Sequence, residues 1–266
     1  MSTQVFLINL EKDRDRLAVM SDQLGMLSIP FERIDAVYGT KMPEWIRPYF
    51  LDADGRIASK LLPGEVGCYA SHLLVLKRIA DSGRPALVLE DDVEISPDFP
   101  SILNSISQLP QGWEIIRLSN PYKRSYVPVS RINSNYQAVK FTHVSPSTGA
   151  YLVTPEGARK FLDWKQLRSL PVDQDMRRVW DCKLVTYGIF PRPITPDVGT
   201  SSIDGMVQRK VRSYQKKKTV QDELARIAFD IQWLGVKAWA LNLFYSKSAE
   251  RPARTPVGRN VSATKH

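Results

Sequence analysis

The hydrophobic pattern is clearest where an apolar run ends in three adjacent acids. Residues 86–89 read Ala-Leu-Val-Leu, and Glu90, Asp91 and Asp92 follow directly. Such a run predicts a strand buried on both faces, and α/β proteins bind ligands at the carboxyl ends of such strands. Adjacent carboxylates repel one another, and their oxygens suit Mg²⁺ or Mn²⁺, which hold substrate phosphates. The run predicts a divalent-cation site, with a solvated acidic turn as the alternative.

Strand and helix patterns alternate on either side of this run. A first strand is predicted over residues 4–10, and a polar turn after it leads into a helix that ends near Leu24. Later strands are predicted over residues 113–119 and 149–154. Thr154-Pro155-Glu156 then supplies an N-cap, a first-turn proline and an early acid, which together begin a helix. The alternation predicts an α/β fold with a mostly parallel central sheet and helices on its faces.

Seven short motifs occur in order between about residues 4 and 204. They read VFLINL from Val5, DRDR from Asp13, FERIDAVYG from Phe31, GEVGCYASH from Gly64, EDD from Glu90, GAY from Gly149 and PVD from Pro171. In this order and spacing they resemble the glycosyltransferases of family 25, which include bacterial lipooligosaccharide galactosyltransferases and collagen-modifying domains. The resemblance implies a GT-A-type nucleotide-sugar-binding fold in a catalytic domain of residues 1–204.

The resemblance also implies where the nucleotide-sugar donor binds. Asn9, Arg14 and Arg16 follow the first strand and are assigned to the donor, with Arg14 or Arg16 facing its pyrophosphate. Ala36, in the third motif, belongs to the same implied donor site. For each arginine, a solvated helix start is the alternative.

The acidic cluster is the implied metal site. Enzymes of the GT-A type carry two acids separated by one residue of any kind. In this pattern Asp92 is the leading ligand of Mn²⁺ or Mg²⁺, and Glu90 is the second. Glu90 and Asp91 are also placed against the donor, and Asp91 replaces Asp92 if the local backbone is rotated. The ion would act as a Lewis acid on the departing nucleoside diphosphate.

A helix is predicted over residues 63–79, with Pro63 in its first turn. Its apolar stripe consists of Val66, Tyr69, Leu73, Leu76 and Ala80. Glu65, Cys68 and His72 share another face, but a single His and a single Cys make a poor zinc signature. We therefore favour a structural or donor-pocket role for His72. Gly67 is expected to let the helix approach another backbone closely.

A second acidic pair, Asp173 and Asp175, lies far from the first in the sequence. The family is inverting, and such a transfer needs a carboxylate that removes the proton of the acceptor hydroxyl. Asp173 is predicted to be this base or a ligand of a sugar hydroxyl. The alternative is that Asp173 caps a helix over residues 174–180.

Residues 120–135 are predicted to form a mobile lid, an acceptor-recognition loop or a plain hairpin. His143, which follows them, is favoured as a non-functional residue.

The net charge of +9 comes entirely from the carboxyl-terminal part. Residues 1–204 hold 24 Lys and Arg against 24 Asp and Glu, whereas residues 205–266 hold 13 against 4. The chain is therefore predicted to be a neutral catalytic domain followed by a cationic extension over residues 205–266.

The extension is predicted to contain an amphipathic helix that begins after Thr219. Basic residues gather between Arg209 and Lys218, and the helix stripe consists of Val220, Leu224, Ile227, Ile231, Leu234, Ala238, Leu241 and Tyr245. Three roles stay open: packing on the catalytic core, binding an anionic membrane surface through residues 205–246, or forming a homodimer.

Several protein classes are disfavoured by composition. The sequence has no apolar stretch of about 18 residues and no signal-peptide pattern at its start. Cys68 and Cys182 are its only cysteines, which excludes a disulfide framework. The expected location is the cytoplasm, with peripheral attachment to the inner membrane as an addition.

The function implied by the resemblance is metal-dependent, inverting transfer of a hexose, most simply galactose from UDP-galactose, to a saccharide such as a lipooligosaccharide or lipopolysaccharide core. One alternative is an inactive family homologue that binds a sugar nucleotide or a partner. A nucleic-acid-binding protein is the weaker alternative, because the first 204 residues are neutral and contain no binding motif; nucleic acid is not an expected partner.

Overall fold

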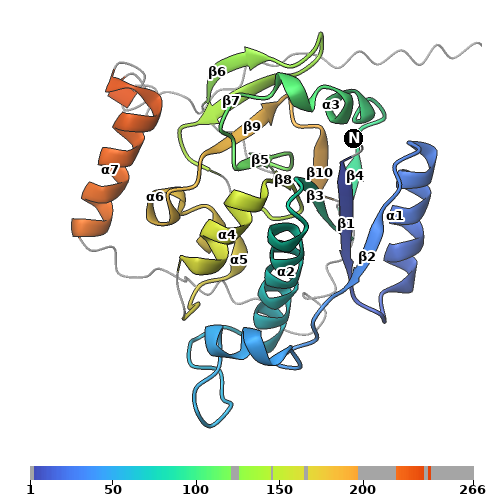
Figure 1. Cartoon of the computed structure of the whole chain (residues 1–266), viewed down its shortest axis with the longest axis vertical. Helices are drawn as coiled ribbons and strands as arrows, with labels where there is room; N and C mark the ends of the chain where they lie inside the picture. Colours follow the sequence, from blue (N-terminus) through green and yellow to red (C-terminus); the bar gives the residue numbers. More distant parts are fainter. Residues whose placement is uncertain are drawn as a thin grey trace, which may run out of the picture.

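The computed structural model describes residues 3–120, 126–144, 146–164, 167–196, 220–236 and 239–240. An eight-stranded sheet forms its centre, in the order β2-β1-β3-β8-β5-β9-β7-β6 (Figure 1). Its strands are β1 (Gln4–Asn9), β2 (Glu32–Asp35), β3 (Ala86–Glu90), β5 (Ile115–Arg117), β6 (Tyr126–Arg131), β7 (Gln137–Phe141), β8 (Ala150–Val153) and β9 (Thr186–Phe190). A separate antiparallel pair consists of β4 (Val93–Ile95) and β10 (Ile194–Pro196).

Most strands of the large sheet run in one direction. β1 pairs in parallel with β2 and β3, and β5 pairs in parallel with β9. β8 runs antiparallel between β3 and β5, and β7 runs antiparallel between β9 and β6. Six of these eight strands therefore share a direction, and β8 and β7 oppose it. The predicted α/β class with a mostly parallel central sheet is confirmed.

Helices cover both faces of the sheet (Figure 1). One face carries α2 (Pro63–Ser82), α4 (Pro155–Asp163), α5 (Val172–Met176) and α6 (Val179–Cys182), and the other carries α1 (Arg14–Met26) and α3 (Pro100–Asn104). The short 3-10 helices are η1 (Glu44–Tyr49) and η2 (Ile106–Gln108). Phe6 and Val88 pack in the first apolar cluster, whereas Leu7 and Leu89 pack in the second. Because neighbouring strand residues point to opposite faces, β1 and β3 are buried on both faces, as predicted for β3.

Helix α2 fixes the loop that follows β2. The predicted apolar stripe of α2 is buried throughout. A Cβ atom at Gly67 would lie 2.5 Å from the Val37 carbonyl oxygen and 2.9 Å from the Gly39 nitrogen, so the close approach requires glycine. The Ser71 hydroxyl accepts a 2.8 Å bond from Val37 N and donates a 2.7 Å bond to Gly67 O. The expected close approach at Gly67 is confirmed.

Two smaller predictions concern local elements. The Thr154 hydroxyl accepts a 3.1 Å bond from Gly157 N, which caps α4 as predicted. In the segment predicted as a lid or hairpin, β6 and β7 form an antiparallel pair. The hairpin alternative is therefore correct for residues 126–135, and residues 121–125 lie outside the described part.

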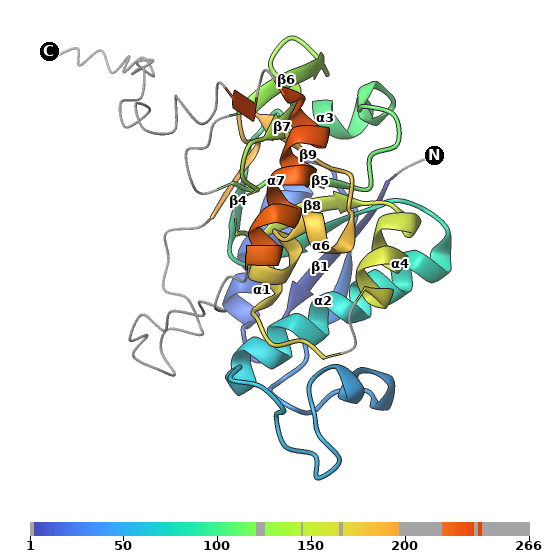
Figure 2. The same cartoon turned by 90° about the vertical axis from the view of Figure 1, so that its left-hand side faces the viewer.

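The described part of the extension is α7 (Val220–Leu234), which lies beside α6, β7 and β9 (Figure 2). Lys140 Nζ donates a 2.7 Å bond to Trp233 O and lies 4.2 Å from the centroid of the Trp233 ring. The Tyr187 and Trp233 ring centroids are 5.0 Å apart. Packing on the core is thus a role of α7, whereas membrane binding and dimerisation stay predictions. The basic cluster between Arg209 and Lys218, and the predicted boundary at residues 204 and 205, lie outside the described residues.

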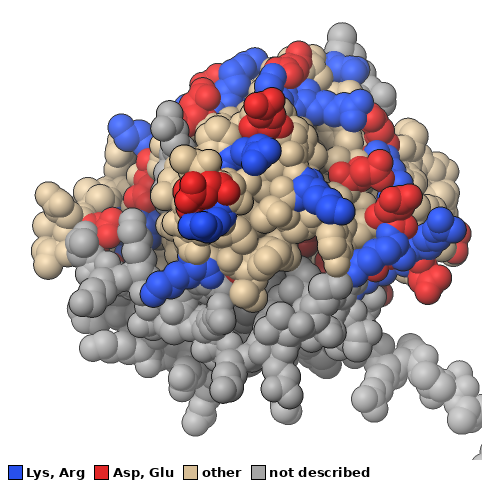
Figure 3. Space-filling model, turned by 90° about the horizontal axis from the view of Figure 1, so that it is seen from below, with Lys and Arg blue, Asp and Glu red and all other residues tan. Residues whose placement is uncertain are grey.

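Surface charge and helix hydropathy add two observations. Basic and acidic side chains alternate over the described surface that Figure 3 shows, in keeping with the equal charge counts of residues 1–204. Among the described helices, none combines the length and the apolar character that crossing a bilayer requires.

Candidate functional site

The carboxyl ends of β1 and β3 meet at one edge of the sheet. Their parallel register places Ile8 opposite Glu90, so Asn9 and the acidic cluster emerge side by side. The Asn9 carbonyl oxygen accepts a 3.0 Å bond from Ala36 N, just beyond β2. Folding therefore brings together Asn9, Ala36 and the acids, as the predicted donor site requires.

Asp91 is anchored by side chains from the β1–α1 connection. Asn9 Nδ2 donates a 2.7 Å bond to Asp91 Oδ2, and Arg16 Nη1 donates a 3.1 Å bond to Oδ1. Asn9 Oδ1 in turn accepts a 3.0 Å bond from Arg33 Nε. Burial raises the pKa of Asp91, while Asn9 and Arg16 oppose that rise. Both carboxylate oxygens already accept hydrogen bonds from the protein, which makes Asp91 a weaker candidate for a metal ligand than a carboxylate facing solvent.

Arg14 and Arg16 lie in the same turn of α1 but face different surroundings. Arg16 Nη1 contacts Asp91 and lies 3.9 Å from Asp92 Oδ2. Arg14 is exposed and lines a hollow on the protein surface together with Glu11 and Leu17. Residues two apart on a helix are separated by about 200° around its axis, so both cannot face one cluster. The structure brings Arg16 against the acids, whereas the donor role of Arg14, which lines a hollow on the flank of the helix, stays a prediction.

Asp92 is the most open of the three acids. Its side chain is 40% exposed, against 13% for Asp91 and 24% for Glu90. Burial raises the pKa of Asp92 to about 6, and the negative charges of Glu90 and Asp91 add to the rise. The 3.9 Å ion pair with Arg16 offsets this only in part. An accessible carboxylate with surplus negative charge around it is suited to bind a hard divalent cation.

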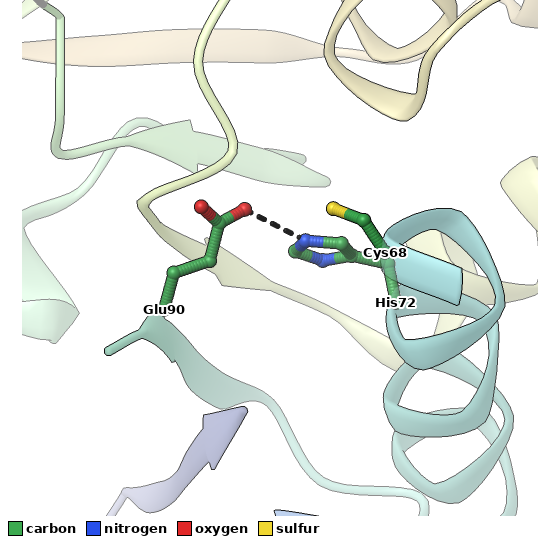
Figure 4. Close-up of side chains that lie close together, drawn as sticks. All are labelled: Cys68, His72 and Glu90. Atoms are coloured by element: carbon green, nitrogen blue, oxygen red, sulfur yellow. Dashed lines mark hydrogen bonds and ion pairs between the residues drawn. The ribbon is translucent and has the colours of Figure 1, made fainter. Parts of the chain in front are cut away.

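Glu90 is positioned by a chain of buried hydrogen bonds. His72 Nε2 lies 2.9 Å from Glu90 Oε1, and His72 Nδ1 lies 2.9 Å from the Tyr151 hydroxyl (Figure 4). His72 and Tyr151 are fully buried. Burial alone would raise the pKa of Glu90, but the hydrogen bond and charge of His72, together with Thr148 and Arg117, lower it. A Glu90 carboxylate can accept the bond from His72 Nε2, and this contact fixes His72 beside the site, so both the structural and the donor-pocket role of His72 stay predictions.

The helix face predicted to carry Glu65, Cys68 and His72 is divided in the structure. Glu65 Oε2 accepts a 2.7 Å bond from Leu62 N and so caps the start of α2. Cys68 is half-buried, one turn before His72. Burial and the charge of Glu90 raise the pKa of the Cys68 thiol well above its usual value. The possible ligand atoms that lie within 4.8 Å of one another are therefore those of Cys68, His72 and Glu90, and Glu65 is not among them.

Arg117 is a residue of the site that the sequence did not predict. It ends β5, opposite Tyr151 of β8, and is 2% exposed. Nη1 donates to the Ser147 carbonyl oxygen, whereas Nε and Nη2 have no hydrogen-bond partner among the described residues. Burial lowers the pKa of Arg117 to about 10, and nearby groups including Asp173 and Glu90 oppose this. A lone arginine that ends an apolar strand was the signal available in the sequence.

Asp173 lies inside the first turn of α5 and does not cap it. Pro171 is the N-cap, and the helix runs from Val172 to Met176, so the alternative of a cap for residues 174–180 is wrong. Asp173 Oδ2 accepts a 3.2 Å bond from Gln174 Nε2. Burial and the charge of Glu90 raise the pKa of Asp173, while Gln174 and Arg117 lower it. The raised pKa suits a group that accepts a proton.

His143 lies outside this cluster of site residues. It is exposed, and its Nε2 lies 3.4 Å from Arg226 Nη1 of α7. This contact joins His143 to α7, and its non-functional role stays a prediction.

Known proteins resemble this chain over most of the described sheet. The model of glycosyltransferase family 25 (LPS biosynthesis protein) matches residues 2–176. Procollagen galactosyltransferase 1-B of Xenopus laevis is 31% identical over 193 residues, covering 67% of this chain and 31% of the relative. Procollagen galactosyltransferase 2 of Homo sapiens is 26% identical over 190 residues, covering 64% of this chain and 29% of the relative. "Probable inactive glycosyltransferase 25 family member 3" of Bos taurus is 28% identical over 200 residues, covering 67% of this chain and 32% of the relative. The chain spans about a third of the length of these relatives.

Proposed function

Because this chain belongs to glycosyltransferase family 25, we propose that it transfers a hexose from a nucleotide-sugar donor to a saccharide acceptor. The proposed donor is UDP-galactose, which the names of the two procollagen galactosyltransferases support. The proposed acceptor is a lipooligosaccharide or lipopolysaccharide core, which the description of the family as an LPS biosynthesis protein supports. The proposed transfer inverts the anomeric carbon and depends on Mn²⁺ or Mg²⁺.

The observation that carries the proposal is the contrast between Asp91 and Asp92. Asp91 is held from both sides by Asn9 and Arg16, whereas Asp92 is accessible and has a raised pKa. Both lie where the carboxyl ends of β1 and β3 meet, which is where open α/β sheets bind nucleotides. A fixed carboxylate beside an open one can orient a donor and hold its cation.

The acids fit the cation that the family implies. Asp92 and Glu90 offer carboxylate oxygens, the ligand type that Mn²⁺ and Mg²⁺ prefer, and each raises the local negative charge felt by the other. A bound Mn²⁺ or Mg²⁺ would neutralise charge on the departing nucleoside diphosphate.

The residues of the β1–α1 connection would hold the donor. Arg16 is a guanidinium already held against Asp91, so its charge can face a pyrophosphate oxygen with little loss of side-chain freedom. The bonded pair of Asn9 and Ala36 lies at the ends of β1 and β2, where a nucleoside would lie. Arg14, on the flank of α1, has no part in this proposal.

Asp173 is the proposed base. Its carboxylate takes the proton of the acceptor hydroxyl while that oxygen bonds to the anomeric carbon and the bond from this carbon to the diphosphate breaks on the opposite side. Its raised pKa and its proximity to Glu90 and Arg117 support the assignment. Arg117 would stabilise the carboxylate that accepts the proton and an oxygen of the bound substrate.

The test is UDP release from a panel of UDP-sugars, in Mn²⁺ or in EDTA, with and without a lipooligosaccharide-type acceptor. Release from UDP-galactose that needs the metal and increases with the acceptor is the expected result. Release from a different UDP-sugar would correct the donor. The absence of release from every donor, with binding retained, would contradict an active transferase.

A binding-only homologue is the second candidate. The bovine relative that bears the word inactive in its name favours it, as does the engagement of Glu90 by His72. This candidate predicts that UDP-galactose binds, as measured by calorimetry, and that no UDP is released over hours. For either candidate, we propose that the protein lies in the cytoplasm and attaches peripherally to the inner membrane. Fractionation of cells tests this location.

A further inference from the structure

Three chemically different ligand atoms converge between α2 and the end of β3. Cys68 and His72 are one turn apart on α2, and Glu90 faces them from the sheet (Figure 4). The thiol sulfur, an imidazole nitrogen and a carboxylate oxygen all lie within 4.8 Å of one another. The sulfur and the ring both point toward the space beside the carboxylate (Figure 4).

The mixture of ligand types selects the kind of ion. Mg²⁺ and Mn²⁺ favour all-oxygen sites, whereas Zn²⁺ accepts sulfur, nitrogen and oxygen together in a tetrahedral arrangement. Zinc bonds of about 2.0–2.3 Å place neighbouring ligand atoms roughly 3.3–3.6 Å apart. The separation of 2.9 Å between His72 Nε2 and Glu90 Oε1 would have to widen by about half an ångström. Rotation of the Glu90 side chain, which is 24% exposed, would widen this separation, and the sulfur, which lies within 4.8 Å, would have to approach the other two atoms.

His72 already has the partner that a zinc-binding histidine needs. A ligating imidazole usually donates its other N–H to a fixed acceptor, which sets the ring orientation. The Tyr151 hydroxyl lies 2.9 Å from His72 Nδ1 and can accept that bond. With zinc on Nε2, the proton of the His72 ring would be on Nδ1, and the Cys68 thiol would release one proton to solvent.

We propose that Cys68, His72 and Glu90 form a Zn²⁺ site with an open fourth position. His72 closes the buried side, and the half-buried Cys68 and Glu90 leave the other side to water or a substrate atom. Without zinc, His72 Nε2 and Glu90 Oε1 are hydrogen-bonded to each other at 2.9 Å. The zinc site overlaps the hard-cation site proposed at Asp92, because the two share Glu90.

Cobalt is the probe, because Co²⁺ replaces Zn²⁺ and its bond to a thiolate gives a charge-transfer band in the near ultraviolet. The full chain titrated with Co²⁺ is expected to show this band, and Zn²⁺ is expected to abolish it. C68S should lose the band, whereas C182S should keep it, because Cys182 is the other cysteine and lies on α6, outside the set. E90Q should weaken cobalt binding at least about tenfold.

Circular dichroism and the melting temperature of each variant show that the fold is kept. A band that survives in C68S, or that disappears in C182S, overturns the proposal. A folded wild-type chain without a band at millimolar cobalt also overturns it.

A consequence for activity rests on the proposed function. Zinc on Glu90 removes that carboxylate from the donor site, so Zn²⁺ is expected to inhibit Mn²⁺-supported UDP release. Measured against each variant's own zinc-free rate, C68S should need at least about tenfold more zinc for the same inhibition, and C182S should match the wild type. Equal zinc sensitivity in C68S contradicts this consequence. If no donor gives UDP release, the proposed function fails, and the cobalt titration still decides the zinc site.

Discussion

The two sides of the site differ in how their polar groups are satisfied. On the β1 side, which consists of Asn9, Arg16 and Asp91, each side chain is hydrogen-bonded to another member. On the β5 side, which consists of Arg117 and Asp173, two guanidinium nitrogens have no partner among the described residues. Asp173 there accepts from its own chain neighbour and has a raised pKa.

The difference separates binding from chemistry. The β1 side takes its final geometry on folding, so a ligand meets groups that are already oriented. The β5 side holds a buried cation whose unpaired donors cost about 1–3 kcal/mol each until an oxygen arrives. Groups with perturbed pKa values and unmet hydrogen bonds are typical of the reacting end of an active site. The β1 side is therefore expected to govern donor affinity, and the β5 side is expected to govern turnover.

Asp92, which lies 3.9 Å from Arg16 of the β1 side, gives the largest predicted effect. D92N keeps the size of the side chain and removes the charge that would hold the cation. We expect UDP release to fall by about 10²–10³-fold with donor binding in EDTA little changed. E94Q, an exposed acid two residues further on, is the control and should retain its rate. A D92N variant with wild-type turnover would move the metal ligand elsewhere.

The same residue predicts a pH dependence of stability. The pKa of Asp92 rises from an ordinary value of 3.8 to about 6 on folding, so between these values the folded state binds more protons than the unfolded state. The contribution of Asp92 to the free energy of unfolding therefore falls as the pH rises from about 4 to 6. Chemical denaturation in EDTA should show this decline in the wild type and a smaller decline in D92N. A steeper decline in D92N would contradict the assignment.

A substitution of Arg117 tests the β5 side directly. R117M removes the charge and all donors while keeping an apolar stem, and we expect kcat/KM to fall by about 10–100-fold. Because the Arg117 charge lowers the pKa of Asp173, the acidic limb of the pH–rate profile should move to higher pH in this variant. R131M, at the exposed end of β6, is the matched control. An unshifted acidic limb would show that Asp173 is not the base, or that Arg117 does not act on it.

Gly67 tests the close contact between α2 and the loop that follows β2. G67A would push a Cβ atom against the Val37 carbonyl oxygen at 2.5 Å, so we expect a loss of about 1–3 kcal/mol in the free energy of unfolding. G64A, three residues earlier on the same helix, meets no atom within 4 Å and should be neutral or slightly stabilising. Denaturant unfolding compares the two, and equal stabilities would show that the helix adjusts to the added methyl group.

The sequence predicted the two sides unequally, for a physical reason. The carboxyl ends of parallel strands share one edge, so Asn9 and the acids could be placed together from strand patterns alone. Arg117 and Tyr151 meet through the antiparallel insertion of β8 between β3 and β5, and local periodicity does not encode that strand order. Glu65 shares a helix face with Cys68 by spacing, yet its backbone cap on Leu62 N takes it out of the cluster.

The smallest predicted effect separates Arg16 from Arg14, which the sequence could not distinguish. R16M removes the bond that holds Asp91 at 3.1 Å and a donor for the pyrophosphate, so the dissociation constant of UDP-galactose should rise by about three- to tenfold. R14M removes an exposed charge from the flank of α1 and should change the dissociation constant of UDP-galactose less than about twofold. Calorimetry at two salt concentrations compares them, because a charge contact with the donor weakens as salt rises. If both variants lose affinity equally and lose it only at low salt, the arginines act through long-range attraction, and the fixed geometry of the β1 side contributes nothing to donor binding.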